Sequence, residues 1–501
     1  MADSTPYSTV NALVKAKPGW INPIDAERLA AYKTYDDMYH SNPGTYELMV
    51  RGSDDLPIYM PTAKNLINTL ARYVGRGFGY AVDQTQGTPA MQKLAVETYG
   101  SLFIRERILS TFSRCKKSLL KFGDAFWYIQ GDSEKPEGKR LSVKTIDPGL
   151  MFVRNHPEDP DRVVGWDMVE QITETDKVMI VRQRWLKNTA PDHPATGQPD
   201  APVWYQKVKM ELEGWEGDSP KGLQVINETM FPEGIIELPI YHMKNNEEDS
   251  NPYGSSELRS LERVIAAINQ AVTDQDIALA LAGLGVYATG PGGPTDENGN
   301  ESSWIIGPGE VIEDPEFKRI NGISSISPSL EHIKYLEAAA DKAVGITDVT
   351  RGQVSADVAA SGVALAIRMA PTIDAADEKD LHIKDVFDQF LFDLKAWFKA
   401  FESVDVGEAH IYTMFGDKLP GNRQSEIEEL LKLLENGVVS VEFVQKELTD
   451  RYGFQFPVDM LQQIADRKAA DAAAADPYAQ RAADTTLDDG TDPADTANLG
   501  E

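Results

Sequence analysis

The chain has a single cysteine, Cys115, and no long apolar run. One cysteine excludes a disulfide within the chain and fits assembly in a reducing cytoplasm. The first twenty residues lack the apolar core that a secretion signal needs. The longest uncharged stretch, residues 277–295, holds about a dozen mainly apolar residues before its glycines and prolines begin, too few to cross a bilayer. We therefore expect a soluble protein that contacts no membrane.

Basic residues are also scarce, with 49 lysines and arginines against 79 acidic residues and a formal net charge of -30. Proteins that grip duplex DNA are usually basic, because lysine and arginine release condensed counterions from the phosphates. The composition therefore predicts that this chain is no DNA clamp. Its 501 residues, 42% of them hydrophobic, can bury a sizeable core, and the length predicts roughly three domains.

Signatures of catalysis are missing as well. No GxxxxGK[ST] loop is present, so the chain lacks the phosphate cradle of an ATP-driven motor. The glycine-rich residues 289–301 contain neither its lysine nor a following helix. The seven histidines are scattered without the i, i+4 spacing of a zinc helix. We expect no enzyme, no metal and no cofactor. Acidic pairs such as Asp36/Asp37 and Glu247/Glu248 leave a carboxylate-dependent hydrolase as an alternative, although solvated surface explains such pairs better.

What the sequence does contain is clearest in residues 251–401. Apolar side chains at alternating spacings of three and four predict a helix over residues 254–282, capped by Ser255 or Ser256: Leu258, Leu261, Ile265, Ile268 and Val272. A glycine- and proline-rich insert with short strands follows over residues 283–327. Pro328 then occupies the first turn of a second predicted helix, residues 328–349.

After this helix, residues 350–361 are small and polar and predict an exposed loop. The strongest periodic signal of the chain comes next and predicts a long helix with one buried face: Ile383, Phe387, Phe390, Leu394, Trp397 and Phe401. Pro371 lies inside this pattern, and we expect the helix to kink or restart there because proline removes a backbone donor.

The remaining regions predict an α+β protein. Helices are expected over Pro23–His40, after the sequence PIYMP, and over residues 91–122 with a break near Gly100. Six β-rich runs lie between Gly123 and Met243: DAFWYIQ, RLSVKTI, VVGWDMVEQI, VMIVRQRWL, VWYQKVKMEL and IIELPIYHM. The sequence EAHIYTMF predicts a returning strand, and three short helices are expected between residues 423 and 468.

An ordered series of blocks resembles the portal proteins of long-tailed double-stranded DNA bacteriophages, the siphophage-type portal family. The blocks are YDDMYHSNPGTYEL, KFGDAFWYIQGD, TIDPGLMFV, NPYGSSELRSLERVIAAINQAVTD and, after the glycine-rich insert, ITDVTRGQVSADVAASGVALAIR. The resemblance covers about residues 35–466. It implies a portal fold of wing, helical stem, β-rich clip and helical crown, which assembles into a ring with a central channel.

Placed on this sequence, the resemblance implies a wing, a stem, a clip, a tunnel loop and a crown. The corresponding ranges are 1–253 for the wing, 254–282 and 328–349 for the stem helices, 283–327 for the clip, 350–361 for the tunnel loop, 362–418 for the long kinked helix and returning wing strand, 419–468 for the crown, and 469–501 for an acidic disordered tail.

The resemblance also implies the function and the sites. A ring of about twelve copies would sit at one capsid vertex of the virion, as the channel for genome packaging and ejection and the docking site for the large terminase subunit and a head-tail adaptor. Major capsid and scaffolding proteins are further implied partners, and DNA would pass without sequence specificity. The implied tunnel-loop residues are Arg351, Gln353, Ser355 and Asp357, and the implied clip residues that bind partners are Trp304, Ile305, Ile306 and Phe317.

Two questions stay open from the sequence. The acidic charge either lines the channel, where it would keep DNA from adhering, or serves the solubility of the outer surface. A different virion ring or scaffold component is the main alternative to a portal.

Overall fold

The computed structural model describes residues 23–49, 57–83, 85–174, 177–198, 200–211, 222–248, 251–284, 286–288, 318–320, 327–353, 362–419 and 423–452. The chain divides into two compact units, Met1–Leu419 and Pro420–Glu501. The first combines helices with antiparallel sheets, as the predicted α+β class requires.

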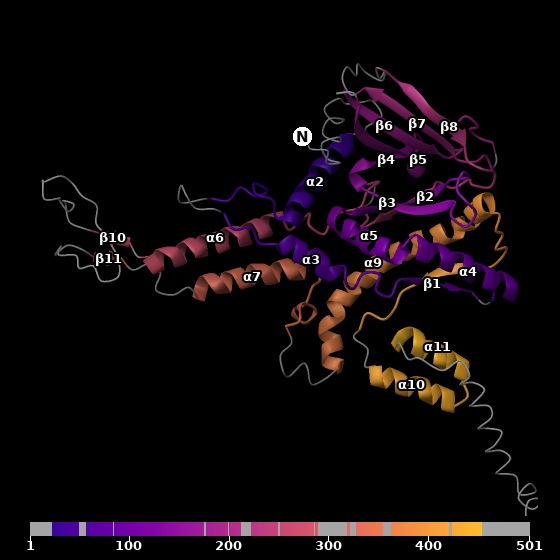
Figure 1. Ribbon diagram of the computed structural model, residues 1–501. Coiled ribbons are helices and arrows are strands. Elements are labelled where there is room, and N and C mark those ends of the chain that lie inside the picture. Colours follow the sequence, from indigo (N-terminus) through magenta and orange to yellow (C-terminus); the bar gives the residue numbers. More distant parts are fainter. Residues whose placement is uncertain are drawn as a thin grey trace, which may run out of the picture. The chain divides into compact units, whose positions relative to one another are not determined.

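Among the described residues, four helices precede the two larger sheets (Figure 1). They are α2 (Pro23–His40), α3 (Thr62–Leu70), α4 (Pro89–Arg105) and α5 (Ile108–Phe122). The predicted break near Gly100 is wrong, because α4 continues through this residue and ends five residues later. Arg107, with φ of 51°, makes the turn into α5. Gly100 instead allows close packing, since a Cβ there would lie 3.0 Å from the Tyr80 hydroxyl.

Two antiparallel sheets follow. The first has the order β3-β2-β9 and the second the order β4-β5-β6-β7-β8. Their strands are β2 (Asp124–Gly131), β3 (Leu141–Ile146), β4 (Met151–His156), β5 (Asp159–Glu174), β6 (Lys177–Leu186), β7 (Trp204–Glu211), β8 (Gln224–Met230) and β9 (Ile240–Lys244). All six β-rich runs contain a strand, whereas β8 was not predicted. Every residue of β8 is exposed, so no alternation of apolar and polar residues marks it.

A helical hairpin comes next in the chain. Helices α6 (Glu262–Leu284) and α7 (Ser327–Ala343) pack against each other, and the short antiparallel pair β10 (Val286–Ala288) and β11 (Lys318–Ile320) lies between them in sequence (Figure 1). The predicted start of the first helix at residue 254 is wrong. The Ser256 hydroxyl donates to the Lys121 carbonyl and accepts from the Leu258 amide, so residues 257–261 form turns before the helix begins. Helix α7 also ends earlier than predicted.

The long helix α9 (Gly362–Trp397) forms the centre of the main core. All six residues of the predicted stripe, from Ile383 to Phe401, are at most 8% exposed, which confirms that prediction. Pro371 lies inside α9 without ending it, and Figure 1 shows the helix bent in its first part. A π-helix, Phe398–Glu402, follows. The chain then returns as β12 (Ile411–Met414), the predicted strand, which pairs with β1 (Gly79–Val82).

The second unit contains α10 (Arg423–Glu435) and α11 (Val441–Tyr452), two of the three predicted short helices. Gly437, with φ of 70°, stands in the left-handed conformation just after α10, as expected of a helix-ending glycine. The third predicted helix and the predicted disordered tail lie outside the described residues.

Candidate functional site

The α6–α7 hairpin is anchored at its base by the segment that precedes α3. Side chains of α6 accept hydrogen bonds from three backbone amides of that segment: Met49 to Gln270 Oε1 at 2.7 Å, Ile58 to Thr273 Oγ1 at 3.0 Å and Met60 to Asn269 Oδ1 at 2.8 Å. Asn269 and Thr273 are buried. These bonds satisfy backbone donors that have no partner within a strand or helix, and they fix α6 against the rest of the first unit.

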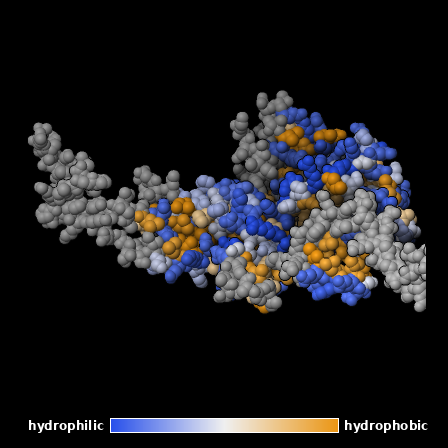
Figure 2. Space-filling view, turned by 60° about the horizontal axis from the view of Figure 1, so that its bottom comes forward, coloured by the Kyte–Doolittle hydropathy of each residue, from blue (hydrophilic) through white to orange (hydrophobic). Residues whose placement is uncertain are grey.

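The hairpin also presents apolar side chains to solvent. Leu279 is 44% exposed, Leu330 45% and Tyr335 70%. Figure 2 shows hydrophobic residues gathered over this part of the molecule. An apolar surface on an extended hairpin is typical of an element that contacts another protein chain.

The segment from α7 to α9 has a defined local structure up to residue 353. The Thr350 hydroxyl accepts from the Thr347 amide at 3.2 Å and donates to the Thr347 carbonyl at 2.7 Å. These bonds cap a 3-10 turn, Asp348–Arg351, and Gly352 ends the turn with φ of 86°. The Arg351 guanidinium forms an ion pair with Asp341 of α7, which is 5% exposed. Burial raises the pKa of Asp341 to about 6, and Arg351 opposes this rise.

Of the four predicted tunnel-loop residues, the structure places Arg351 and Gln353. Arg351 is half-buried and turned toward α7, whereas Gln353 is exposed and its amide donates to the Asp348 carbonyl at 3.0 Å. The other two, Ser355 and Asp357, lie outside the described residues. So do all four predicted clip residues: Trp304, Ile305, Ile306 and Phe317. The assignment of these residues to DNA or to partners therefore stays a prediction.

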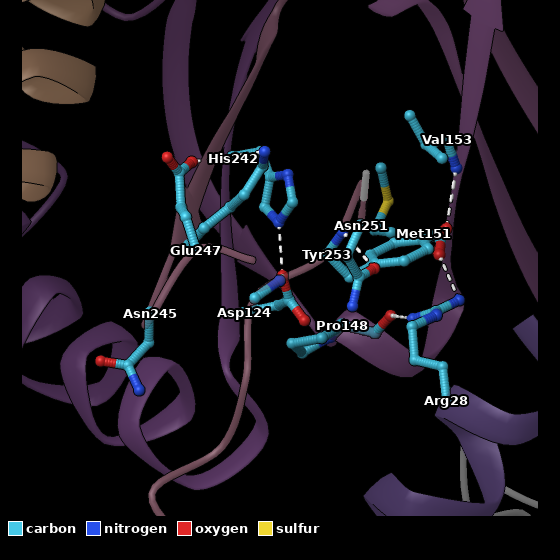
Figure 3. A network of polar contacts seen from close by, with 12 residues as sticks. Arg28, Asp124, Pro148, Met151, Val153, His242, Asn245, Glu247, Asn251 and Tyr253 are labelled. Atoms are coloured by element: carbon cyan, nitrogen blue, oxygen red, sulfur yellow. Dashed lines mark hydrogen bonds and ion pairs between the residues drawn. The ribbon is translucent and has the colours of Figure 1, made fainter. Parts of the chain in front are cut away.

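The structure also contains a buried polar cluster that was not predicted from the sequence (Figure 3). It lies between α2, the turn before β4 and the segment that leads to α6. Arg28, 8% exposed, donates to the carbonyls of Pro148 and Met151, both at 2.9 Å, and to Asp25 at 3.0 Å. Its guanidinium also lies 4.0 Å from the centre of the Tyr253 ring. One side chain of α2 thus holds the turn before β4 and the segment that leads to α6.

Asp124, which is fully buried, forms the second part of this cluster. It accepts hydrogen bonds from the Tyr32 hydroxyl, from His242 Nε2 at 2.6 Å and from the Gly254 amide at 2.9 Å. Burial lowers the pKa of His242, which favours its neutral form. Because the Asp124 carboxylate can only accept, it places the ring proton on Nε2. The cluster contains no exposed nucleophile, and its members hold one another. It acts as a joint between α2, the first sheet and the entry to α6.

Only one part of this joint, the Asp25–Arg28 pair, could have been predicted from the sequence. Asp25 and Arg28 stand one turn apart on a helix whose buried face is otherwise apolar, and a charged pair on that face indicates a buried ion pair. The partners at residues 148, 151 and 253 could not be read from spacing.

In the part of the chain that the structure describes, no group of three or more histidine, cysteine, aspartate or glutamate residues could hold a metal ion. Among the described helices, none is long and apolar enough to span a membrane.

Comparison with known proteins gives little further guidance. No family model and no curated protein matches the chain. A solved chain from the virion of a native gene transfer agent particle is similar over 90% of this chain and 100% of its own length, with 12% identity and a TM-score of 0.38. A likeness of this size does not establish a common fold.

Proposed function

We propose that this chain is the subunit of a portal ring of a tailed double-stranded DNA phage or a related particle. The observation that carries the proposal is the ordered series of portal-like sequence blocks. The described elements around them agree with it: an anchored helical hairpin, a short capped segment after it, and a long helix that returns into the core. In this reading the hairpin is the stem.

The proposal assigns the chain a passive role in DNA movement. The missing phosphate-binding loop means that the force for packaging comes from a partner, the large terminase. DNA would pass through the channel without sequence-specific contacts, and the net charge of -30 per copy favours passage without adhesion. After packaging, the same ring would bind a head-tail adaptor.

The contacts of the acidic pairs argue against the hydrolase alternative. Asp36 pairs with Lys121 at 2.7 Å, Asp37 accepts a hydrogen bond from Asn42 at 2.8 Å, and Glu248 pairs with Arg259. These carboxylates belong to local ion pairs and hydrogen bonds, which is the ordinary state of surface acids.

The test is the assembly state of the purified full chain. Mass measurement and particle images should reveal closed rings of about twelve copies with a channel wide enough for a duplex, about 20 Å across. Monomers alone at micromolar concentration would contradict the proposal.

The tunnel-loop assignment has its own test. Deletion of residues 353–360 should leave rings and procapsids intact but reduce DNA filling or retention. The intact chain, assembled in parallel, is the control, and normal filling by the deletion variant would remove the assignment.

A further inference from the structure

Strand β8 forms one edge of the five-stranded sheet, and this edge is exposed. Among the described strands, β7 is the only neighbour of β8, and all seven residues of β8 are exposed. Exposed edges of natural sheets are commonly blunted by lysine, proline or a bulge. The pairing of β7 with β8 has a bulge at Ile226, but residues 227–230 continue in regular register and include no lysine or proline.

One hydrogen bond shows which backbone amides face β7 at the Met230 end of β8 and which face away. The Phe231 amide donates to the Val203 carbonyl on the β7 side at 2.9 Å. Amide directions alternate along a strand, so the amide of Thr229 also faces β7, whereas those of Glu228 and Met230 face away from the sheet. Two backbone donors therefore lie on the open edge, where an added strand would meet them.

A cavity of about 480 Å³ adjoins the same end of β8. Its lining combines aromatic side chains from both sheets and from the end of α9 with polar ones, and none of the lining residues is charged. These residues are Tyr128, Gln130, Gly131, Ser133, Tyr205, Asn227, Thr229, Met230, Phe231, Pro232, Trp397 and Phe401.

The rings in this cavity form a connected set. The ring centres of Phe231 and Trp397 are 5.4 Å apart, those of Trp397 and Phe401 are 5.4 Å apart and stacked, and Tyr205 stacks on Phe231 at 6.3 Å. Such a lining suits a flat uncharged side chain, and the amides and hydroxyl at residues 130, 227 and 229 can orient it.

We propose that β8 and this cavity together bind an extended peptide segment of a partner protein. The segment pairs with residues 227–230 as an added strand and places an aromatic side chain in the cavity. Addition of a strand supplies affinity through main-chain hydrogen bonds, and the cavity supplies specificity. A free small molecule would use the cavity but leave the open edge without a partner. The inference goes beyond the proposed ring function and holds whether or not the chain forms rings.

The test uses a random nonapeptide display library, selected on the full-length protein. Enriched peptides should share an uncharged aromatic residue next to β-branched residues. A synthetic copy of the best peptide, labelled with a fluorophore, then gives a dissociation constant by fluorescence polarisation. On binding, hydrogen exchange of the Glu228 and Met230 amides, which face away from β7, should slow.

Matched variants locate the binding. Glu228→Pro removes an outward amide, and Asn227→Trp fills the cavity from an exposed position, so each should weaken binding by about tenfold or more. Glu228→Thr keeps the amide and should leave affinity within about twofold. Circular dichroism verifies the fold, and if Glu228→Pro does not fold, Asn227→Trp still decides the question.

Three results would overturn the proposal. One is the absence of enriched peptides, and another is an enriched peptide that binds the two disruptive variants as tightly as the parent chain. The third is slow exchange of the Glu228 and Met230 amides in the protein without peptide, which would mean that these two donors are already occupied.

Discussion

At the scale of single residues, Arg28 illustrates what a buried charge requires. Its guanidinium is 8% exposed, yet its hydrogen bonds reach two backbone carbonyls and a carboxylate, and the Tyr253 ring covers one face. The planar fork matches these acceptors, which a lysine ammonium cannot do in the same way.

We expect Arg28→Met to lower the free energy of unfolding by about 3–5 kcal/mol, because it removes the cation beside the buried Asp25 carboxylate and the donor to two buried carbonyls. Urea unfolding followed by tryptophan fluorescence measures the change. Lys33→Met, on an exposed position of the same helix, is the control and should stay within about 0.5 kcal/mol of the parent. Equal effects of the two substitutions would refute the role given to Arg28.

Asp393 makes stability depend on pH. It accepts hydrogen bonds from Tyr241 at 2.9 Å and Gln389 at 2.8 Å, and burial raises its pKa from 3.8 to about 6. The folded chain therefore binds this proton more tightly than the unfolded chain. The contribution of Asp393 to stability is greatest below about pH 4 and declines as pH rises to about 6.

Asp393→Asn should remove this decline. Relative to the parent, the variant should gain up to about 1.4 kcal/mol per pH unit between about pH 4 and 6 and show no further change above. Unfolding titrations across this range measure the difference. Glu134→Gln, which changes an exposed carboxylate, is the control, and its free energy of unfolding should vary with pH as that of the parent does. If the difference in free energy between Asp393→Asn and the parent did not vary with pH, the predicted titration would be ruled out.

At the scale of elements, helical periodicity predicted which faces are buried better than where helices begin. The stripe on α9 is buried throughout, as are Leu258 and Leu261, although these two precede α6 rather than belong to it. The start of α6 depends on Ser256, whose hydroxyl donates to the Lys121 carbonyl, a group 135 residues away. The residues next to Ser256 in sequence cannot show that its hydroxyl will bond to a carbonyl so far away instead of capping the helix at residue 254.

The ion pair between Arg351 and Asp341 should stabilise the segment after α7. Arg351→Gln should lower stability by about 1–3 kcal/mol, because Asp341 then remains buried without its cationic partner. Hydrogen exchange of residues 344–353 should become faster. Lys334→Gln, at an exposed position of α7, is the control, and unchanged exchange in Arg351→Gln would mean that the pair does not hold this segment.

At the scale of the whole molecule, several large apolar side chains on helices of the first unit are exposed to solvent. Tyr335 is 70% exposed, Ile367 68%, Leu381 66% and Phe392 57%. Scattered exposed apolar residues are normal, and these positions are candidates for subunit contacts in the proposed ring.

We expect the double substitution Tyr335→Glu with Ile367→Glu to prevent ring assembly while the monomer still folds, because these exposed positions lose little packing within the chain. Sedimentation velocity measures the assembly state. Lys139→Glu alters the net charge by the same amount at an exposed site of the first sheet's loop and should leave assembly unchanged. Normal rings of the double variant would exclude these two positions from the subunit interface.

Residue types and their spacing were enough to predict the α+β class, the long helix with its buried stripe and most strands, and to reveal the lack of the motifs that a motor or zinc enzyme needs. Those properties follow from residue type and spacing along a short length of chain. Tertiary structure alone decided that Arg28 meets residues 148, 151 and 253, that Asp124 joins Tyr32 to His242, and that β8 stands open beside an aromatic cavity. Periodicity encodes which face of an element is buried, whereas the identity of its partner depends on packing between segments more than a hundred residues apart.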